Sequence, residues 1–285
     1  MKNLIIRTIT GIGFVALIVA AILLSDNEAL GIKFSLLPYF FLVFTCVALY
    51  EYRTLLKKQK INLSVLFYAI SLLIYLIASI PRNVWEIFLI YLVLPVLFLF
   101  FLLFIVELFR KQENPFTNIA YSILGIIWIV LPFALINRFP LLLKWKIGGD
   151  DGRFLLLSVF IIIWLYDTFA YCVGMLIGKH RLFERISPKK SWEGAIGSTI
   201  LTLILAYFAN LLFPMLPLNP LQWIGLALVI IVFGTLGDLA ESLFKRQLSV
   251  KDSGTILPGH GGVLDRFDSI LFAVPFVWIY LNLVL

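Results

Sequence analysis

The segment LVIIVFGTLGDLAESLF, residues 228–244, joins a long apolar run to two acidic side chains, Asp238 and Glu241. The apolar run begins near residue 221, so it has the length of about 20 residues that an α-helix needs to cross a bilayer. Asp238 and Glu241 are three residues apart and therefore lie on one face of such a helix. A carboxylate at the centre of a bilayer costs about 2.5–3.5 kcal/mol. The segment therefore predicts a membrane-crossing helix whose acidic face meets a polar interior.

Similar apolar runs recur along the whole chain of 285 residues. The residues are 62% hydrophobic and only 14% charged, whereas a soluble domain has roughly 25% charged residues. The first run follows a basic flank, as in a signal peptide, but eight further runs follow it, so we expect an uncleaved first span. We predict an all-α, polytopic transmembrane helical bundle of about nine helices, over residues 4–24, 30–52, 64–81, 84–109, 117–143, 154–178, 195–213, 221–244 and 268–285.

Lysine and arginine are distributed unevenly between the two sides of this predicted bundle. With the N-terminus inside, the inner segments hold 17 of the 23 basic residues and the outer segments hold 6. Cytoplasmic loops carry such an excess, so we expect the N-terminus and most of the net charge of +7 on the cytoplasmic side. Cys46 and Cys172 lie within apolar runs and the chain has no CxxC pair, which indicates packing residues rather than a disulfide or a thiolate metal site.

Acidic residues divide the chain into two regions. In residues 1–149 they lie only near the ends of the predicted helices, at Glu51, Glu86 and Glu107, where a carboxylate can reach the interface. We interpret this region as a hydrophobic transmembrane scaffold. In residues 150–285, acids occur within the helices and glycine-rich loops connect them. We therefore expect a transmembrane catalytic region here, with a polar cavity that faces the cytoplasm.

Five carboxylates on three predicted helices are expected to face that cavity. Asp167 lies in the middle of its apolar span, and Asp265 and Asp268, again three residues apart, begin the last helix. Carboxylate clusters without histidine or cysteine suit Mg²⁺, which usually takes one or two carboxylates and completes its shell with phosphates and water. His180 and His260 are too few and too far apart for a zinc motif. The alternative is that each acid pairs locally, as Glu241 could pair with Lys245 one turn later.

Candidate phosphate-binding residues surround these acids. Lys245, Arg246, Lys251 and Arg266 precede or begin the last helix, and the segment HRLFERISPKKSWEG, residues 180–194, adds a second basic group. The segment LPGHGG, residues 257–262, contains three glycines whose backbone can adopt positive φ and present N–H groups to an anion. Taken alone, such a turn often only reverses the chain. The chain has neither a G-x-S-x-G nor a P-loop pattern, so a nucleotide would bind outside the soluble NTPase designs.

The order S-x-x-K-R, four residues, K-D-S-G, two residues, L-P-G-H-G-G and then x-x-D-R-x-D runs from Ser242 to Asp268. It resembles the signature of phosphatidate cytidylyltransferases, also called CDP-diacylglycerol synthases. The segments WLYDTFAYCVGMLIGKH, SPKKSWEGAIGS and GDLAESLFKR resemble the same family, so the specific likeness covers residues 160–270. The resemblance implies a homodimeric enzyme of the inner (cytoplasmic) membrane with a cytoplasmic active site, which transfers CMP from CTP to phosphatidate. It implies CTP, the phosphatidate lipid and the membrane as partners and no nucleic acid, with Mg²⁺ as cofactor and a monovalent cation such as K⁺ beside it.

Roles follow from the resemblance residue by residue. The implied catalytic residues are Asp265, Asp268, Asp238, Lys251 and Arg266. The implied metal ligands are Asp265, Asp238, Asp268 and Glu241. The implied substrate-binding residues are Lys189, Lys190, Ser191, Arg246, Ser253, Gly259, His260, Gly261, Gly262 and Asp167. Two other classes stay open on the residues alone: a CTP-dependent lipid kinase of the polyprenol or dolichol type, and a secondary transporter with intramembrane acids.

Overall fold

A computed structural model describes residues 2–24, 36–79, 85–147, 152–257, 259 and 261–285. Nearly all regular structure within these ranges is helical, which confirms the all-α prediction. The helices are α1 (Lys2–Leu23), α2 (Leu37–Lys57), α3 (Val65–Ser79), α4 (Trp85–Phe109), α5 (Pro115–Gly125), the π-helical turn η3 (Ile126–Val130), α6 (Leu131–Ile136), α7 (Phe139–Ile147), α8 (Gly152–Ile177), α9 (Trp192–Tyr207), α10 (Ala209–Leu212), α11 (Pro220–Gln247) and α12 (Leu264–Val284). A short antiparallel ribbon of β1 (Arg181–Phe183) and β2 (Ser187–Ser191), which the sequence did not predict, joins α8 to α9.

Five helical segments among the described residues are long and apolar enough to cross a membrane: Leu37–Lys57, Pro115–Ile136, Gly152–Ile177, Pro220–Gln247 and Leu264–Val284. Four shorter apolar stretches lie within α1, α3, α4 and α9, at Thr8–Leu23, Val65–Ile77, Leu97–Phe109 and Trp192–Tyr207. The chain is therefore a multi-pass membrane protein. The count of about nine spans stays a prediction, because five segments of the described residues meet both the length and the apolar character of a full span.

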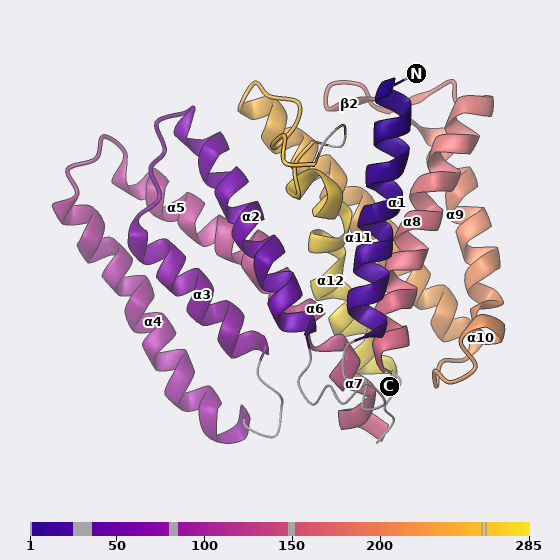
Figure 1. Cartoon of the computed structure of the whole chain (residues 1–285), viewed down its shortest axis with the longest axis horizontal. Coiled ribbons are helices and arrows are strands. Elements are labelled where there is room, and N and C mark those ends of the chain that lie inside the picture. Colours follow the sequence, from indigo (N-terminus) through magenta and orange to yellow (C-terminus); the bar gives the residue numbers. More distant parts are fainter. Residues whose placement is uncertain (1, 25–35, 80–84, 148–151, 258, 260) are drawn as a thin grey trace.

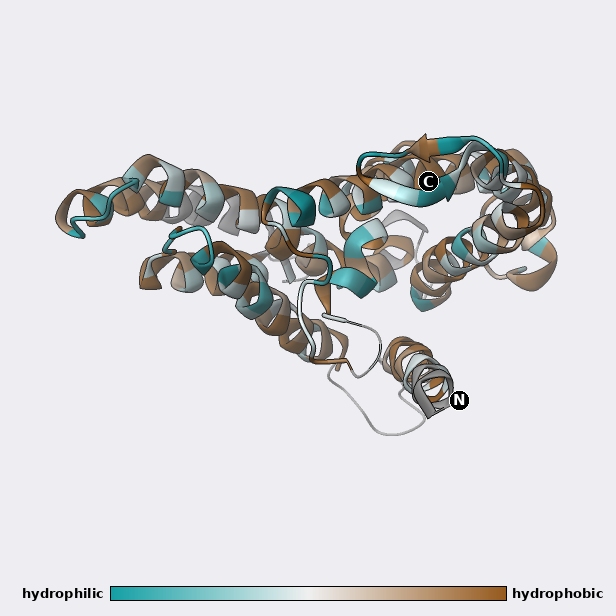
Figure 2. Cartoon of the chain, turned by 90° about the horizontal axis from the view of Figure 1, so that it is seen from above, coloured by the Kyte–Doolittle hydropathy of each residue, from teal (hydrophilic) through white to brown (hydrophobic). Residues whose placement is uncertain are grey.

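The polar connections that matter for function meet at one end of the bundle. Figure 1 shows the start of α1, the β1–β2 ribbon and the loop between α11 and α12 at that end, with the C-terminus at the other. Seen from above in Figure 2, α1 stands to one side of the other helices, and hydrophilic residues are concentrated in the ribbon and the loops. The fold thus brings the basic segment around residues 179–190 and the loop 248–263 to the same end.

Helix α11, which carries Asp238 and Glu241, has well-defined ends. Asn219 Oδ1 accepts a hydrogen bond from the backbone N–H of Gln222 at 2.9 Å, and Gln222 Oε1 accepts one from the backbone N–H of Asn219 at 2.8 Å. This reciprocal capping box satisfies two amide groups that a helix start leaves unpaired. Pro220 occupies the first helical turn, where its missing N–H costs nothing. Lys245 and Arg246 lie in the last turn, where their positive charge interacts favourably with the helix dipole.

Glycine allows α11 and α12 to pack closely beside the acidic residues. A Cβ atom on Gly237 would lie 2.5 Å from Phe272 Cβ and 2.7 Å from the backbone oxygen of Asp268. Small residues at such positions let helices in membranes approach each other. One helical turn further from the loop, Phe233 stacks on Phe276 with ring centroids 3.5 Å apart. Gly237 therefore brings the backbone around Asp268 against the turn of α11 that carries Asp238.

We predict that Gly237→Ala separates these helices and lowers the stability of the protein. The added methyl group meets backbone and Cβ atoms that cannot rotate away, and overpacking of this kind costs about 1–3 kcal/mol. Thermal unfolding in detergent measures the effect. Gly234→Ala is the matched control, because a Cβ there would lie 3.7 Å from Ser269 Cβ, an ordinary contact. Equal melting temperatures for the two variants would contradict the packing argument.

Candidate active site

The loop between α11 and α12 is organised around the carboxylate of Asp265. Its Oδ2 accepts hydrogen bonds from the backbone N–H of Ser253 at 2.8 Å, from Ser253 Oγ at 2.9 Å and from the backbone N–H of Gly262 at 2.8 Å. Its Oδ1 accepts a hydrogen bond from Lys245 Nζ at 2.6 Å. The bond to Gly262 reaches back three residues, in the manner of the acidic residue of a capping box. Asp265 therefore ties both sides of the loop to the first turn of α12.

The glycine-rich turn has the backbone geometry expected from its sequence. Gly259 and Gly261 have φ values of 76° and 82°, a region that glycine enters without steric strain. The backbone N–H of Leu257 donates to the carbonyl of Gly261 at 3.0 Å and closes the turn. Gly262 differs from the other two glycines, because its N–H group is bound to Asp265 and does not point to an anion site. The predicted ligand His260 lies outside the described residues.

Lys245 is the central cation of the buried polar cluster. Its Nζ lies 2.6 Å from Asp265 Oδ1 and 3.0 Å from Glu241 Oε1, and its side chain is 11% exposed. The local pairing of Glu241 with Lys245, which the sequence left open, is thus confirmed. Among the described residues, Glu241 Oε2 is buried without a hydrogen-bond partner. Glu241 therefore contributes charge to a cluster that Lys245 only partly neutralises.

A second acidic group lies on the neighbouring faces of α8, α11 and α12. Asp238 Oδ2 forms an ion pair with Lys190 Nζ from β2, and Asp238 Oδ1 accepts a hydrogen bond from Ser242 Oγ at 3.3 Å. Asp268 Oδ1 accepts the backbone N–H of Ser269 at 2.7 Å. Asp167 on α8 interacts electrostatically with both Lys190 and Asp238, and Asp268 with Asp238. The structure thus brings together Asp167, Asp238, Asp268 and Lys190, which are far apart in the sequence.

The ribbon carries the second basic segment toward this group. Ser191 begins α9 and accepts a hydrogen bond on Oγ from the backbone N–H of Gly194 at 3.2 Å, so it serves as the helix cap. Glu193, before the expected span at 195–213, lies with Oε1 2.5 Å from His180 Nδ1. This contact with the His180 ring is the main cause that lowers the pKa of Glu193 to about 2. Glu193 is therefore charged at neutral pH and fixes the start of the ribbon.

The remaining predicted residues lie at the surface of the same end. Lys189, Arg246, Lys251 and Arg266 are exposed. Arg246 Nη1 donates to the backbone oxygen of Val250 at 3.3 Å, so it closes the turn after α11. The assignment of these four side chains to substrate phosphates stays a prediction.

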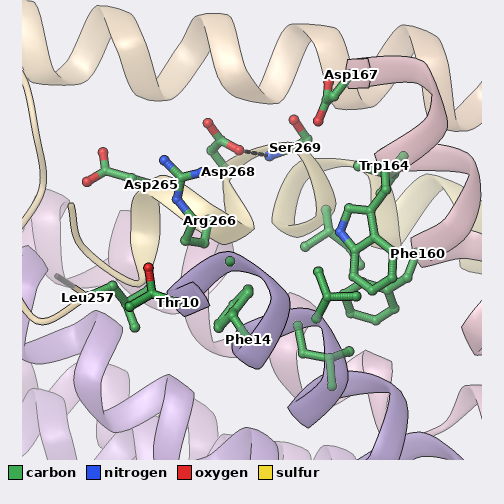
Figure 3. A pocket seen from close by; sticks show the side chains of 15 residues that line it. Thr10, Phe14, Phe160, Trp164, Asp167, Leu257, Asp265, Arg266, Asp268 and Ser269 are labelled. Carbon is green, nitrogen blue, oxygen red and sulfur yellow. Dashed lines mark hydrogen bonds between the residues drawn. The ribbon is translucent and has the colours of Figure 1, made fainter. Parts of the chain in front are cut away.

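A cavity of about 210 Å³ lies between α1, α8 and α12 and reaches Leu257 in the loop. Its polar lining consists of Thr10, Asp167, Asp265, Arg266, Asp268 and Ser269. Its apolar lining includes Phe14, Ile18, Phe160, Ile163 and Trp164. In Figure 3, Asp265, Arg266 and Asp268 lie on one side of the cavity, with Phe160 and Trp164 on the other. The site therefore combines charged groups with an apolar surface inside the membrane region.

The predicted metal ligands do not form a complete cage. Within the described ranges, no group of three acidic, histidine or cysteine side chains is placed to hold a metal ion. Both oxygens of Asp265 already accept hydrogen bonds from the protein, and Glu241 lies against Lys245. Asp238 and Asp268 remain, each partly exposed and with a single hydrogen bond to a neighbour on its own helix, and Asp238 also forms an ion pair with Lys190 of β2. Two carboxylates are the number that Mg²⁺ usually takes from a protein when phosphates complete its shell, so this pair fits the ion.

Sequence reasoning missed one residue of this site, Glu51 on α2. From its place near a helix end, Glu51 was assigned to the scaffold with access to the membrane interface, but the residue is 2% exposed and its carboxylate contacts the loop and the start of α12. The signal in the sequence was indirect. The last helix begins after GGV, and Val263 at its N-cap has no side-chain acceptor for the first amide groups. A side-chain acceptor for these amide groups would have to come from elsewhere in the chain.

Comparison with known proteins identifies the class of this chain. It belongs to the cytidylyltransferase family, whose sequence model matches residues 5–284. Among named relatives, it is 40% identical over 171 residues to the phosphatidate cytidylyltransferase of Staphylococcus aureus strain COL, an alignment that covers 60% of this chain and 62% of that protein. It is 34% identical over 235 residues to the phosphatidate cytidylyltransferase of Staphylococcus epidermidis, covering 82% of this chain and 86% of that protein. The match to the first relative thus spans less than two thirds of its length, and the resemblance to this family is confirmed.

We predict that Lys245→Met destabilises the protein strongly. The substitution preserves the length of the side chain but leaves two buried carboxylates, Glu241 and Asp265, without their cation. Removing one partner of a buried ion pair typically costs about 3–5 kcal/mol. Thermal unfolding in detergent tests this, with Arg246→Met as the matched control because Arg246 is the exposed neighbour. A melting temperature for Lys245→Met equal to that of the control would show that the cluster does not depend on this cation.

Proposed function

We propose that this chain is a phosphatidate cytidylyltransferase that transfers CMP from CTP to phosphatidate and releases CDP-diacylglycerol and pyrophosphate. Membership of the cytidylyltransferase family supports the nucleotide chemistry. The observation that carries the proposal is the cavity between α1, α8 and α12, where Asp268 and Arg266 meet an apolar wall. A phosphate lipid that accepts the CMP group needs charged residues for its phosphate and an apolar surface for its acyl chains in the same site.

The reaction places little demand on general-base catalysis. The phosphate oxygen of phosphatidate is already an anionic nucleophile, and it would form a bond to the α-phosphorus of CTP. The bond from that phosphorus to the bridging oxygen would break, and pyrophosphate would leave with the electron pair. The main barrier is repulsion between two polyanions, so catalysis depends on positioning and on neutralising charge.

The residues of the site divide this work. Lys190 forms an ion pair with Asp238 of α11, and Arg266 lines the cavity, so both lie where phosphate charge must gather. Lys189, Lys251 and Arg246 are exposed at the same end and could attract the triphosphate. Ser253, Gly262 and Asp265 hold the loop in shape through the hydrogen bonds among them.

We also propose Mg²⁺ as the cofactor, held by Asp238 and Asp268. Asp167, Asp265 and Asp268 make the cavity lining more acidic than basic, since Arg266 is its single cationic side chain among the described residues. An anionic lipid is repelled by such a lining unless a cation is added. When bound, Mg²⁺ supplies positive charge to the reacting phosphates. The site is expected on the cytoplasmic side of the inner membrane, and the homodimer and the accompanying K⁺ are expectations from the family resemblance.

The first test is the activity itself. Purified protein in detergent with CTP labelled at the α-phosphate, Mg²⁺ and phosphatidate should produce a labelled CDP-lipid and pyrophosphate. In a parallel reaction with CTP labelled at the γ-phosphate, transfer of label to the lipid would indicate a lipid kinase instead, and absence of any CTP-dependent product would overturn the proposal. Asp268→Asn should lower kcat by about 100-fold or more, the effect of removing one group that stabilises transition-state charge. Glu113→Gln, on an exposed carboxylate of the scaffold, is the matched control and should keep full activity.

The second test addresses the metal. Removal of divalent cations with a chelator should abolish CDP-lipid formation, and added Mg²⁺ should restore it. Asp238→Asn should raise the Mg²⁺ concentration needed for half-maximal rate by about 10-fold or more, since it removes one of two ligands. An unchanged Mg²⁺ requirement in Asp238→Asn, with the variant folded as judged by its melting temperature, would remove Asp238 from the metal site.

A further inference from the structure

The carboxylate of Glu51 connects the N-terminal half of the chain to the start of α12. Oε1 accepts a hydrogen bond from the backbone N–H of Val263 at 2.9 Å, and Oε2 accepts one from the backbone N–H of Leu264 at 3.0 Å. Ser253 Oγ also lies within hydrogen-bond distance of Oε2, at 3.2 Å. The first amide groups of a helix have no acceptor within the helix. A buried carboxylate from α2 therefore caps α12, and its negative charge interacts favourably with the helix dipole.

The loop is shaped to admit this carboxylate. A Cβ atom on Gly254 would lie 2.6 Å from Glu51 Oε1, and its three nearest atoms would all belong to Glu51. A Cβ atom on Gly262 would lie 2.5 Å from Glu51 Oε2 and 2.1 Å from Ser253 Oγ. Neither glycine has the positive φ that would itself require glycine. Gly254 therefore needs to be glycine because the carboxylate of Glu51 approaches the backbone closely, and Gly262 because both this carboxylate and Ser253 Oγ do.

We propose that Glu51 is a positioning residue for the active site. Asp265, Arg266 and Asp268 all lie within the first five residues of α12, directly after the two amide groups that Glu51 holds. A small shift or rotation of this turn would move all three side chains relative to Asp238 and Lys190 on other elements. Misplacement by about 1 Å can reduce a rate by about 100-fold. This inference rests on the proposed function, because it assigns Glu51 a task in that same site.

A comparison with a second buried glutamate distinguishes a positioning role of Glu51 from a role in stability alone. Glu107 on α4 is 5% exposed and is bonded to Arg110 and to Asn118, within the helices of the scaffold. Glu51→Gln and Glu107→Gln each keep the side-chain shape and remove one carboxylate. We expect similar melting temperatures for the two variants, but kcat lowered by about tenfold or more only in Glu51→Gln. Full kcat in a folded Glu51→Gln variant would overturn the inference.

The contact between Glu51 and Gly254 provides a test that does not require Glu51→Gln to fold. Gly254→Ala should lower kcat by about tenfold or more in the otherwise unchanged chain, because the methyl group displaces the carboxylate. In a Glu51→Ala background the same substitution should change kcat by less than about twofold, since the atoms it met are gone. Additive effects of the two substitutions would contradict the proposed contact.

Hydrogen–deuterium exchange separates failure of this inference from failure of the proposed function. The amide groups of Val263 and Leu264 should exchange at least about tenfold faster in Glu51→Gln than in the unchanged protein and in Glu107→Gln. This readout needs no substrate. If the unchanged protein makes no CDP-lipid but the exchange difference appears, the proposed function fails and the structural role of Glu51 stands. If exchange at these two amides is the same in all three proteins, Glu51 does not hold the helix and the inference is wrong.

Discussion

The ion pair network of Lys245 with Glu241 and Asp265 is the interaction on which this end of the bundle depends. Each carboxylate alone would be too costly to bury in a membrane-spanning helix. A single ammonium group between them lowers that cost and links the last turn of α11 to the first turn of α12. Asp265 then uses its second oxygen to organise the loop between these helices. The same group of residues therefore neutralises the buried charge and fixes the geometry of the loop.

This arrangement leaves other acids available for chemistry. Asp265 is bonded on both oxygens by Lys245 and the loop. Asp238 is bonded to Lys190 and Ser242, and Asp268 accepts the N–H of Ser269. The acidic residues of the signature therefore make different contacts in the structure, although the sequence alone does not distinguish them. Asp265 and Asp268 both line the cavity between α1, α8 and α12, but only Asp265 also holds the backbone of the loop.

The cavity also gives the first helix a place in the site. Phe14 and Ile18 on α1 line it together with Phe160 and Trp164 on α8. Glu51 on α2 reaches the start of α12. The N-terminal half therefore supplies both an apolar wall and a hydrogen-bond acceptor to a region whose recognisable motifs lie after residue 160. A division into scaffold and catalytic region describes where the motifs are, and the contacts of the site cross that division.

The sequence left open whether Glu241 pairs with Lys245, and the structure decided it. The sequence by itself determined the all-helical membrane class and the shared helix face of Asp238 and Glu241, and it indicated that Gly259 and Gly261 can adopt positive φ. These properties depend on spans of apolar residues, on helical spacing and on the intrinsic freedom of glycine, all of which are local. Only the tertiary structure decided that Lys190 pairs with Asp238, that Asp265 holds the loop and that Glu51 caps α12. Such pairs depend on which helices pack together and at what depth, and no local pattern encodes a contact between residues 51 and 263.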